Sequence, residues 1–171
     1  MELSEEQMAQ LRERGWMCPE LASAGMELVS ARAVSVDGGP AVELTLAGRD
    51  ATMTVYEQRS ESAVSGAFPL DAVSGNSVVE EGYVLQDDGP GRPTVWLHPE
   101  SPARAVVTAR KVTYTVAVEP GGDPQALQTA VEEISLNESS RLVLRGPDSS
   151  EGVWDRIMRG FTVISGSAGN R

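Results

Sequence analysis

Few side chains in this chain could carry out nucleophilic chemistry. Cys18 is the only cysteine and His98 the only histidine, and a Cys–His dyad requires a fold that brings these distant residues together. Cys18 follows Met17 and precedes Pro19, and this apolar setting favours a buried, inert thiol. We therefore predict a non-enzyme with no catalytic residue. The opposing hypothesis, a hydrolase that uses Cys18 and His98, predicts a thiol that reacts quickly near neutral pH.

Metal and nucleotide sites are not indicated either. A tight transition-metal site needs several His or Cys ligands at short spacing, and this chain has one of each. The acidic pairs Glu80–Glu81, Asp87–Asp88 and Glu132–Glu133 do not fit a calcium-binding loop and are typical of a solvated surface. No phosphate-binding loop, dinucleotide fingerprint or nucleophile elbow occurs. We predict no metal site, no cofactor-binding residue and no cofactor.

Tryptophans are the remaining candidates for a recognition surface, because exposed tryptophans often contact partners. The chain has three of them, Trp16, Trp96 and Trp154, and only 5% of its residues are aromatic. We expect them to fill the core over a small sheet. His98, just before Pro99, is interpreted as a polar residue at a strand end.

The charge of the chain limits its partners. The 171 residues carry a formal net charge of −11, which disfavours nucleic acids and anionic membrane surfaces. The nearest approach to a basic cluster, Arg104, Arg110 and Lys111, is too small for a nucleic-acid groove. No apolar run is long enough to span a bilayer, and the charged start "MELSEEQMAQLRERG" does not resemble a signal peptide. We expect no nucleic-acid partner and no direct membrane insertion, and the oligomeric state is left open.

Local signals predict two helices. Ser4 and Gln7 form a capping box that begins a helix over residues 4–14, and Gly15 is suited to end it. The strongest helix signal covers residues 123–136, with Asp123 as N-cap and Pro124 at the first helical position. One apolar stripe follows helical spacing in this segment: Leu127, Ala130, Val131 and Ile134.

Alternating apolar and polar residues predict strands. Residues 26–56 form a three-stranded meander, because the links "DGGP" and "AGRD" are too short to join parallel strands. Residues 82–86 and 94–99 predict a strand each, and residues 103–119 predict two. Weaker signals give a helix or turn at 68–73, a mobile loop near 87–93, an edge strand at 141–147, a helix at 153–159, a strand at 161–164 and a frayed C-terminus.

These elements predict one α+β domain over residues 1–171. We expect an antiparallel sheet of about five to eight strands with the N-terminal helix and the 123–136 helix packed on one face.

Several short motifs resemble the extracytoplasmic domain of membrane-anchored anti-sigma factors from high-GC Gram-positive bacteria. The resemblance covers residues 11–136. Its clearest motifs are "GWMCPEL" at 15–21, "GMELVSA" at 25–31, "GPAVELTL" at 39–46 and "TVYEQ" at 54–58, and looser ones are "VWLHPESPARAVV" at 95–107 and "VTYTVAVE" at 112–119. No site residue carries over, because the motifs are structural; the first is expected to anchor the N-terminal helix on the sheet.

The resemblance implies a non-enzymatic sensor or interaction domain in the cell envelope. Such a domain regulates sigma-factor release by holding the membrane protein intact until a signal allows proteolysis. It implies a protein partner or a protease in the envelope. The sigma-binding region and the transmembrane tether of such proteins are missing from this chain, and a complete chain would instead be cytoplasmic.

A second hypothesis is a periplasmic or lipoprotein-like domain that binds a small apolar ligand. The ligand would lie between the curved sheet and the helix at 123–136. An exposed apolar cavity at this place would favour this hypothesis.

Overall fold

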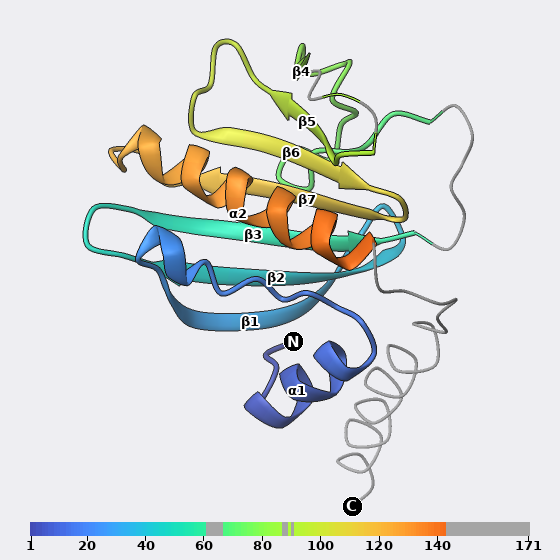
Figure 1. Ribbon diagram of the computed structural model, residues 1–171, viewed down its shortest axis with the longest axis vertical. Helices are drawn as coiled ribbons and strands as arrows, with labels where there is room; N and C mark the ends of the chain where they lie inside the picture. Colours follow the sequence, from blue (N-terminus) through green and yellow to red (C-terminus); the bar gives the residue numbers. More distant parts are fainter. Residues whose placement is uncertain (61–66, 87–88, 90, 143–171) are drawn as a thin grey trace, which may run out of the picture.

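The computed structural model describes residues 1–60, 67–86, 89 and 91–142. These residues form two α-helices, one short 3-10 helix and seven strands (Figure 1). In chain order the elements are α1 (Glu5–Glu13), η1 (Ala22–Ala24), β1 (Glu27–Val36), β2 (Gly39–Ala47), β3 (Thr52–Arg59), β4 (Val84–Gln86), β5 (Thr94–Leu97), β6 (Arg104–Ala109), β7 (Val112–Val118) and α2 (Pro124–Leu142).

All seven strands belong to one antiparallel sheet in the order β1-β2-β3-β7-β6-β5-β4. The first three strands form the predicted meander. The chain then crosses to the opposite edge, begins again at β4 and returns strand by strand, so that β7 pairs with β3 in the centre of the sheet. The predicted α+β class and strand number are confirmed.

Both helices pack on the same face of the sheet (Figure 1). Met8 and Leu11 of α1 and Leu127 and Ile134 of α2 join one core cluster with the inward residues of the strands. The helix α2 contacts β6 and β7. Neither helix of the described part of the chain is long and apolar enough to cross a lipid bilayer.

The N-terminal helix forms as its sequence predicts. The Ser4 side chain accepts a hydrogen bond from the Gln7 backbone N–H, and the Gln7 side chain accepts one from the Ser4 N–H, which completes the capping box. Gly15 then takes a positive φ of 94°, a backbone conformation that suits glycine. The chain then turns back toward the helix, and the backbone N–H of Trp16 donates to the Leu11 carbonyl at 3.0 Å.

The second helix is longer than predicted, since it continues from residue 136 to Leu142. The predicted edge strand at 141–147 is therefore wrong for Arg141 and Leu142, which are helical, and residues 143–147 lie outside the described residues. Helical spacing explains the difference, because Glu138 is buried one turn after Ile134 and pairs with Arg141 at 3.2 Å.

Of the elements predicted from weaker signals, one is confirmed and the others lie partly or wholly outside the described residues. Residues 70–77 form a turn closed by a Leu70–Ser77 bridge, which agrees with the turn alternative at 68–73. In the predicted mobile loop, residues 87, 88 and 90 lie outside the described residues, and the others belong to no helix or strand. The predicted helix at 153–159, strand at 161–164 and frayed C-terminus also lie outside the described residues.

The sheet is wider than its helical cover. Strands about 4.8 Å apart make a seven-stranded sheet roughly 29 Å across, whereas a helix is about 10 Å wide. The helix α1 lies beside β1, and α2 covers β6 and β7, so β5 and β4 extend beyond α2 (Figure 1). On the helix side of these two strands, Val84 and Gln86 of β4 are exposed, whereas Val95 of β5 is buried and Leu97 is half-buried.

Candidate functional site

The fold buries Cys18 in a setting that disfavours its thiolate. Cys18 is only 1% exposed, and its backbone N–H donates to Glu57 Oε2 at 2.7 Å while the Met17 N–H donates to Glu57 Oε1 at 2.9 Å. Burial, followed by the nearby Glu57 charge, raises the pKa of the thiol from 9.0 to about 12. The thiol is therefore protonated at neutral pH, as a packing role predicts.

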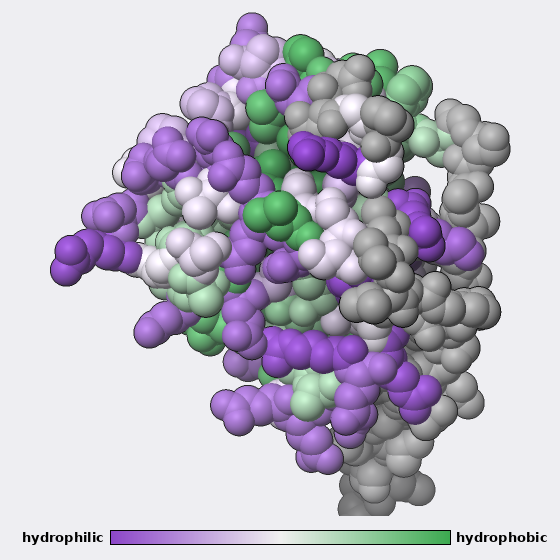
Figure 2. All heavy atoms as spheres, in the orientation of Figure 1, coloured by the Kyte–Doolittle hydropathy of each residue, from purple (hydrophilic) through white to green (hydrophobic). Residues whose placement is uncertain are grey.

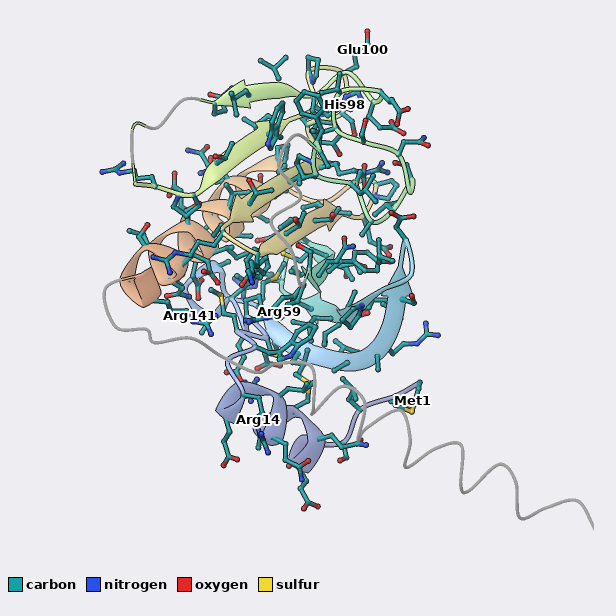
Figure 3. All side chains as sticks on the ribbon, turned by 90° about the vertical axis from the view of Figure 1, so that its right-hand side faces the viewer. Met1, Arg14, Arg59, His98, Glu100 and Arg141 are labelled. Carbon is teal, nitrogen blue, oxygen red and sulfur yellow. The ribbon has the colours of Figure 1, made fainter. Side chains whose placement is uncertain are left out.

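A buried polar network holds this segment in place. Glu57 on β3 is fully buried and pairs with Arg59 at 3.2 Å, and the Arg59 guanidinium lies 5.2 Å from the Trp16 ring centre. Arg59 and Arg141 both donate to the Gly15 carbonyl, and Figure 3 shows these two arginines in the same region of the molecule. The network thus connects residues 15–18 to β3 and to the end of α2.

His98 lies elsewhere. It directly follows β5, which is three strands away from β3, a lateral separation of roughly 14 Å. Its ring meets the Tyr83 ring edge-on with centres 5.0 Å apart, and Figure 3 shows it far from Arg59. Since Cys18 is bound to Glu57 on β3, the structure does not bring Cys18 and His98 together as a dyad.

We expect Cys18 to react with iodoacetamide at least about 100-fold more slowly in the folded protein than in guanidinium at the same pH, because burial and the raised pKa both oppose thiolate formation. Mass spectrometry of timed samples measures both rates, and the denatured protein is the control. Equal rates in the two states would restore the hydrolase hypothesis.

A second buried carboxylate, Asp71, lies on the opposite face of the sheet. It is fully buried and accepts hydrogen bonds from the Tyr83 hydroxyl at 2.8 Å, Arg104 at 2.9 Å and the Val73 N–H at 2.8 Å. The Ala72 N–H donates to the Thr115 hydroxyl of β7 at 3.0 Å. Together these bonds fasten residues 69–83 across the back of the sheet.

Sequence reasoning missed both buried carboxylates. Glu57 had a usable signal, because Met53, Val55 and Glu57 alternate on one strand and all three are buried. Asp71 lies in an irregular segment where no period indicates which side chains point inward.

The helix side of the sheet beside α2 contains a groove of about 910 Å³ that could hold a ligand. We call it the α2 groove. Its floor includes Val95 and Leu97 of β5, and its helical wall includes Leu127, Val131 and Leu136. Leu136 is 68% exposed, and Figure 2 shows hydrophobic atoms uncovered on and beside α2 within a hydrophilic surround. Val95, Leu127 and Val131 are buried at the base of the α2 groove, whereas Leu136 is an apolar side chain exposed to solvent at its rim.

Strand register shows that the two ends of the α2 groove differ. Gln86 pairs with Val95, Val95 with Val107 and Val107 with Tyr114, and the Tyr114 hydroxyl donates to Glu138 of α2 at 2.6 Å. Gln86 therefore lies level with the C-terminal half of α2. We call this the polar end, and its lining includes Gln86, Arg92, Ser135 and Ser139 together with Pro93. We call the opposite end the proline end, and its lining includes Pro99, Pro102 and Pro124 together with His98 and Arg104.

The tryptophans do not line the α2 groove. Trp16 is buried in the main core, and Trp154 lies outside the described residues. Trp96 is half-buried and packs on the small cluster of Val78, Tyr83 and Val106, on the face of β5 opposite to Val95 and Leu97. The core-filling role predicted for Trp16 is confirmed.

Neither a metal cluster nor a known relative helps to define the site. Among the described residues, no group of three or more His, Cys, Asp and Glu side chains is placed to hold a metal ion. Comparisons of the chain with protein families, curated proteins and solved structures give no match. The function is therefore argued from the α2 groove itself.

Proposed function

We propose that this chain is a non-enzymatic binding domain that holds an apolar ligand in the α2 groove. The observation that carries this proposal is the groove itself, an open apolar cavity between the sheet and the helix. Its volume of about 910 Å³ is within the usual range of about 300–1,000 Å³ for ligand sites. Its lining combines apolar side chains, which ligand sites use to bury a ligand, with polar ones that could orient it.

Residues 11–136 resemble extracytoplasmic anti-sigma domains, and we therefore propose that ligand binding serves to sense a signal. The ligand is the signal, and the domain is the sensor that regulates proteolysis and release of the sigma factor in the cell envelope. A connection between the wall of the groove and the N-terminal region supports this role. Arg141, near the end of α2, donates a hydrogen bond to the Gly15 carbonyl just after α1. A ligand that moves α2 therefore also acts on the segment that follows α1.

The proposal is tested by filling the α2 groove. We expect Gln128→Trp to weaken binding of the neutral fluorescent probe N-phenyl-1-naphthylamine by at least about 10-fold, because the indole occupies space that the apolar probe needs. Gln125→Trp is the matched control, because Gln125 is also an exposed glutamine of α2 but does not line the groove. Fluorescence titration measures both affinities.

Two results of this titration count against the proposal. The first is a wild-type protein that does not bind the probe at all. The second is equal weakening by Gln128→Trp and Gln125→Trp, which would place the probe somewhere other than the α2 groove.

A further inference from the structure

We propose that the ligand of the α2 groove is a fatty acid whose carboxylate lies beside Arg92 at the polar end and whose acyl chain extends toward the proline end. This inference rests on the proposed function and names the ligand class. It follows from three features of the groove: an apolar track, an arginine that makes no ion pair with the described residues and a buried hydroxyl that lacks a partner.

The apolar track suits a single extended chain. The groove follows α2 from Leu127 to Ser139, a length of roughly 18 Å at 1.5 Å per residue. Val95 and Leu97 point from β5 toward this side of the sheet, where they pack with the main core. A narrow ligand with a long apolar body buries the most surface on such a track.

Arg92 supplies the charge at the polar end. It is exposed, lines the groove and makes no ion pair or hydrogen bond with the described residues. Arg104, the other arginine of the lining, is already paired with the buried Asp71 at 2.9 Å. In a chain of net charge −11, an unneutralised guanidinium beside an apolar track is complementary to an amphiphile with an anionic head, and a carboxylate matches its planar donors.

Ser135 adds a hydrogen-bond donor at the same end. Its Oγ is buried and has no hydrogen-bond partner, although Ser135 lines the groove one helical turn from Ser139. A buried hydroxyl without a partner is unfavourable, and a ligand oxygen would satisfy it. Gln86, on the facing strand β4, provides a further amide at this end.

Glu132 opposes an anionic head. It also lines the groove, and its carboxylate accepts a hydrogen bond from the Gln128 side chain at 3.1 Å. It lies nearly one turn before Ser135, toward the proline end, so the acyl chain rather than the head passes it. Removing its charge is therefore expected to strengthen fatty-acid binding modestly.

The test compares cis-parinaric acid, a fluorescent fatty acid, with its methyl ester. We expect Arg92→Ala to weaken binding of the acid by about 10-fold, as for loss of one charge-assisted contact, and to change ester binding by less than about 2-fold. Arg49→Ala, which removes an exposed arginine from the β2–β3 turn, is the control and should change neither. Glu132→Gln should bind the acid more tightly than the wild type does.

The outcomes separate this inference from the proposed function. If wild-type protein binds the ester as tightly as the acid, or if Arg92→Ala weakens both equally, the fatty-acid assignment is overturned. Binding of N-phenyl-1-naphthylamine then still supports an apolar ligand. If neither parinaric probe nor the naphthylamine binds, both proposals fail. Circular dichroism checks that Arg92→Ala, a change at an exposed side chain, leaves the fold intact.

Discussion

Replacing Glu57 by alanine lowers the free energy of unfolding by about 3–5 kcal/mol, the cost expected when one member of a buried ion pair is removed. The carboxylate is fully buried and accepts the N–H groups of Met17 and Cys18. Without it, two backbone donors lose their partner and the Arg59 charge loses its neutralising acid. The segment that carries Trp16 then keeps the Arg59 hydrogen bond to the Gly15 carbonyl but loses both backbone hydrogen bonds to β3.

Urea denaturation of wild type and variant measures this effect. Arg12→Ala is the surface control, because the Arg12–Glu20 pair at 2.7 Å is partly exposed and its loss should cost less than about 1 kcal/mol. A Glu57→Ala protein that is as stable as Arg12→Ala would contradict the role given to this network.

The Glu57 carboxylate also makes the free energy of unfolding depend on pH. Burial raises the pKa of Glu57 above its ordinary 4.5, against the opposing effects of Arg59 and the two backbone N–H groups. The folded state therefore holds the proton more tightly than the unfolded chain does. The stabilisation that results from the raised pKa of Glu57 is complete below pH 4.5. This stabilisation declines as the pH rises through the raised pKa. The stability difference between wild type and Glu57→Gln should decrease over this interval, and a constant difference would contradict the assigned shift.

Replacing Asp71 by alanine also lowers the free energy of unfolding by about 3–5 kcal/mol, because the Arg104 charge and the Tyr83 hydroxyl lose a fully buried partner. Residues 69–83 should lose their attachment to the back of the sheet first. Hydrogen exchange is expected to increase at the Val78 and Tyr83 amides, which lie in this segment.

Asp50→Ala is the control for this prediction, since Asp50 is an exposed aspartate in the β2–β3 turn. Its loss should change stability much less and leave exchange in residues 69–83 unaltered. An Asp71→Ala variant with wild-type exchange in that segment would show that other contacts hold it.

Local signals predict the elements of this fold because their causes are local. The Ser4–Gln7 capping box and Pro124 at the start of α2 are both observed. The "DGGP" link forms a tight hairpin in which Asp37 and Gly38 both take positive φ, at 49° and 76°, as such turns require. The end of α2 was harder to predict, because it depends on contacts of Glu138 with Tyr114, a residue far away in the sequence.

The candidate site was predicted only in outline. Only the second hypothesis places a ligand between the sheet and the second helix, and the two different ends of the groove depend on register. Arg92 and Ser135 meet at one end because β7 pairs with β3 and the chain returns from β4 through β5 and β6. No local pattern around Arg92 or Ser135 indicates this pairing, since it is fixed by long-range packing of the whole sheet.

Mapping of backbone amide shifts during titration with N-phenyl-1-naphthylamine tests the central claim most directly. The account predicts that the largest changes follow β5 and the groove-facing side of α2, including Val95, Leu97 and Val131. Residues of β1 and β2, which lie on the other half of the sheet, should change little. Saturable changes centred on β1 and β2, with none along α2, would contradict the claim that the α2 groove is the binding site.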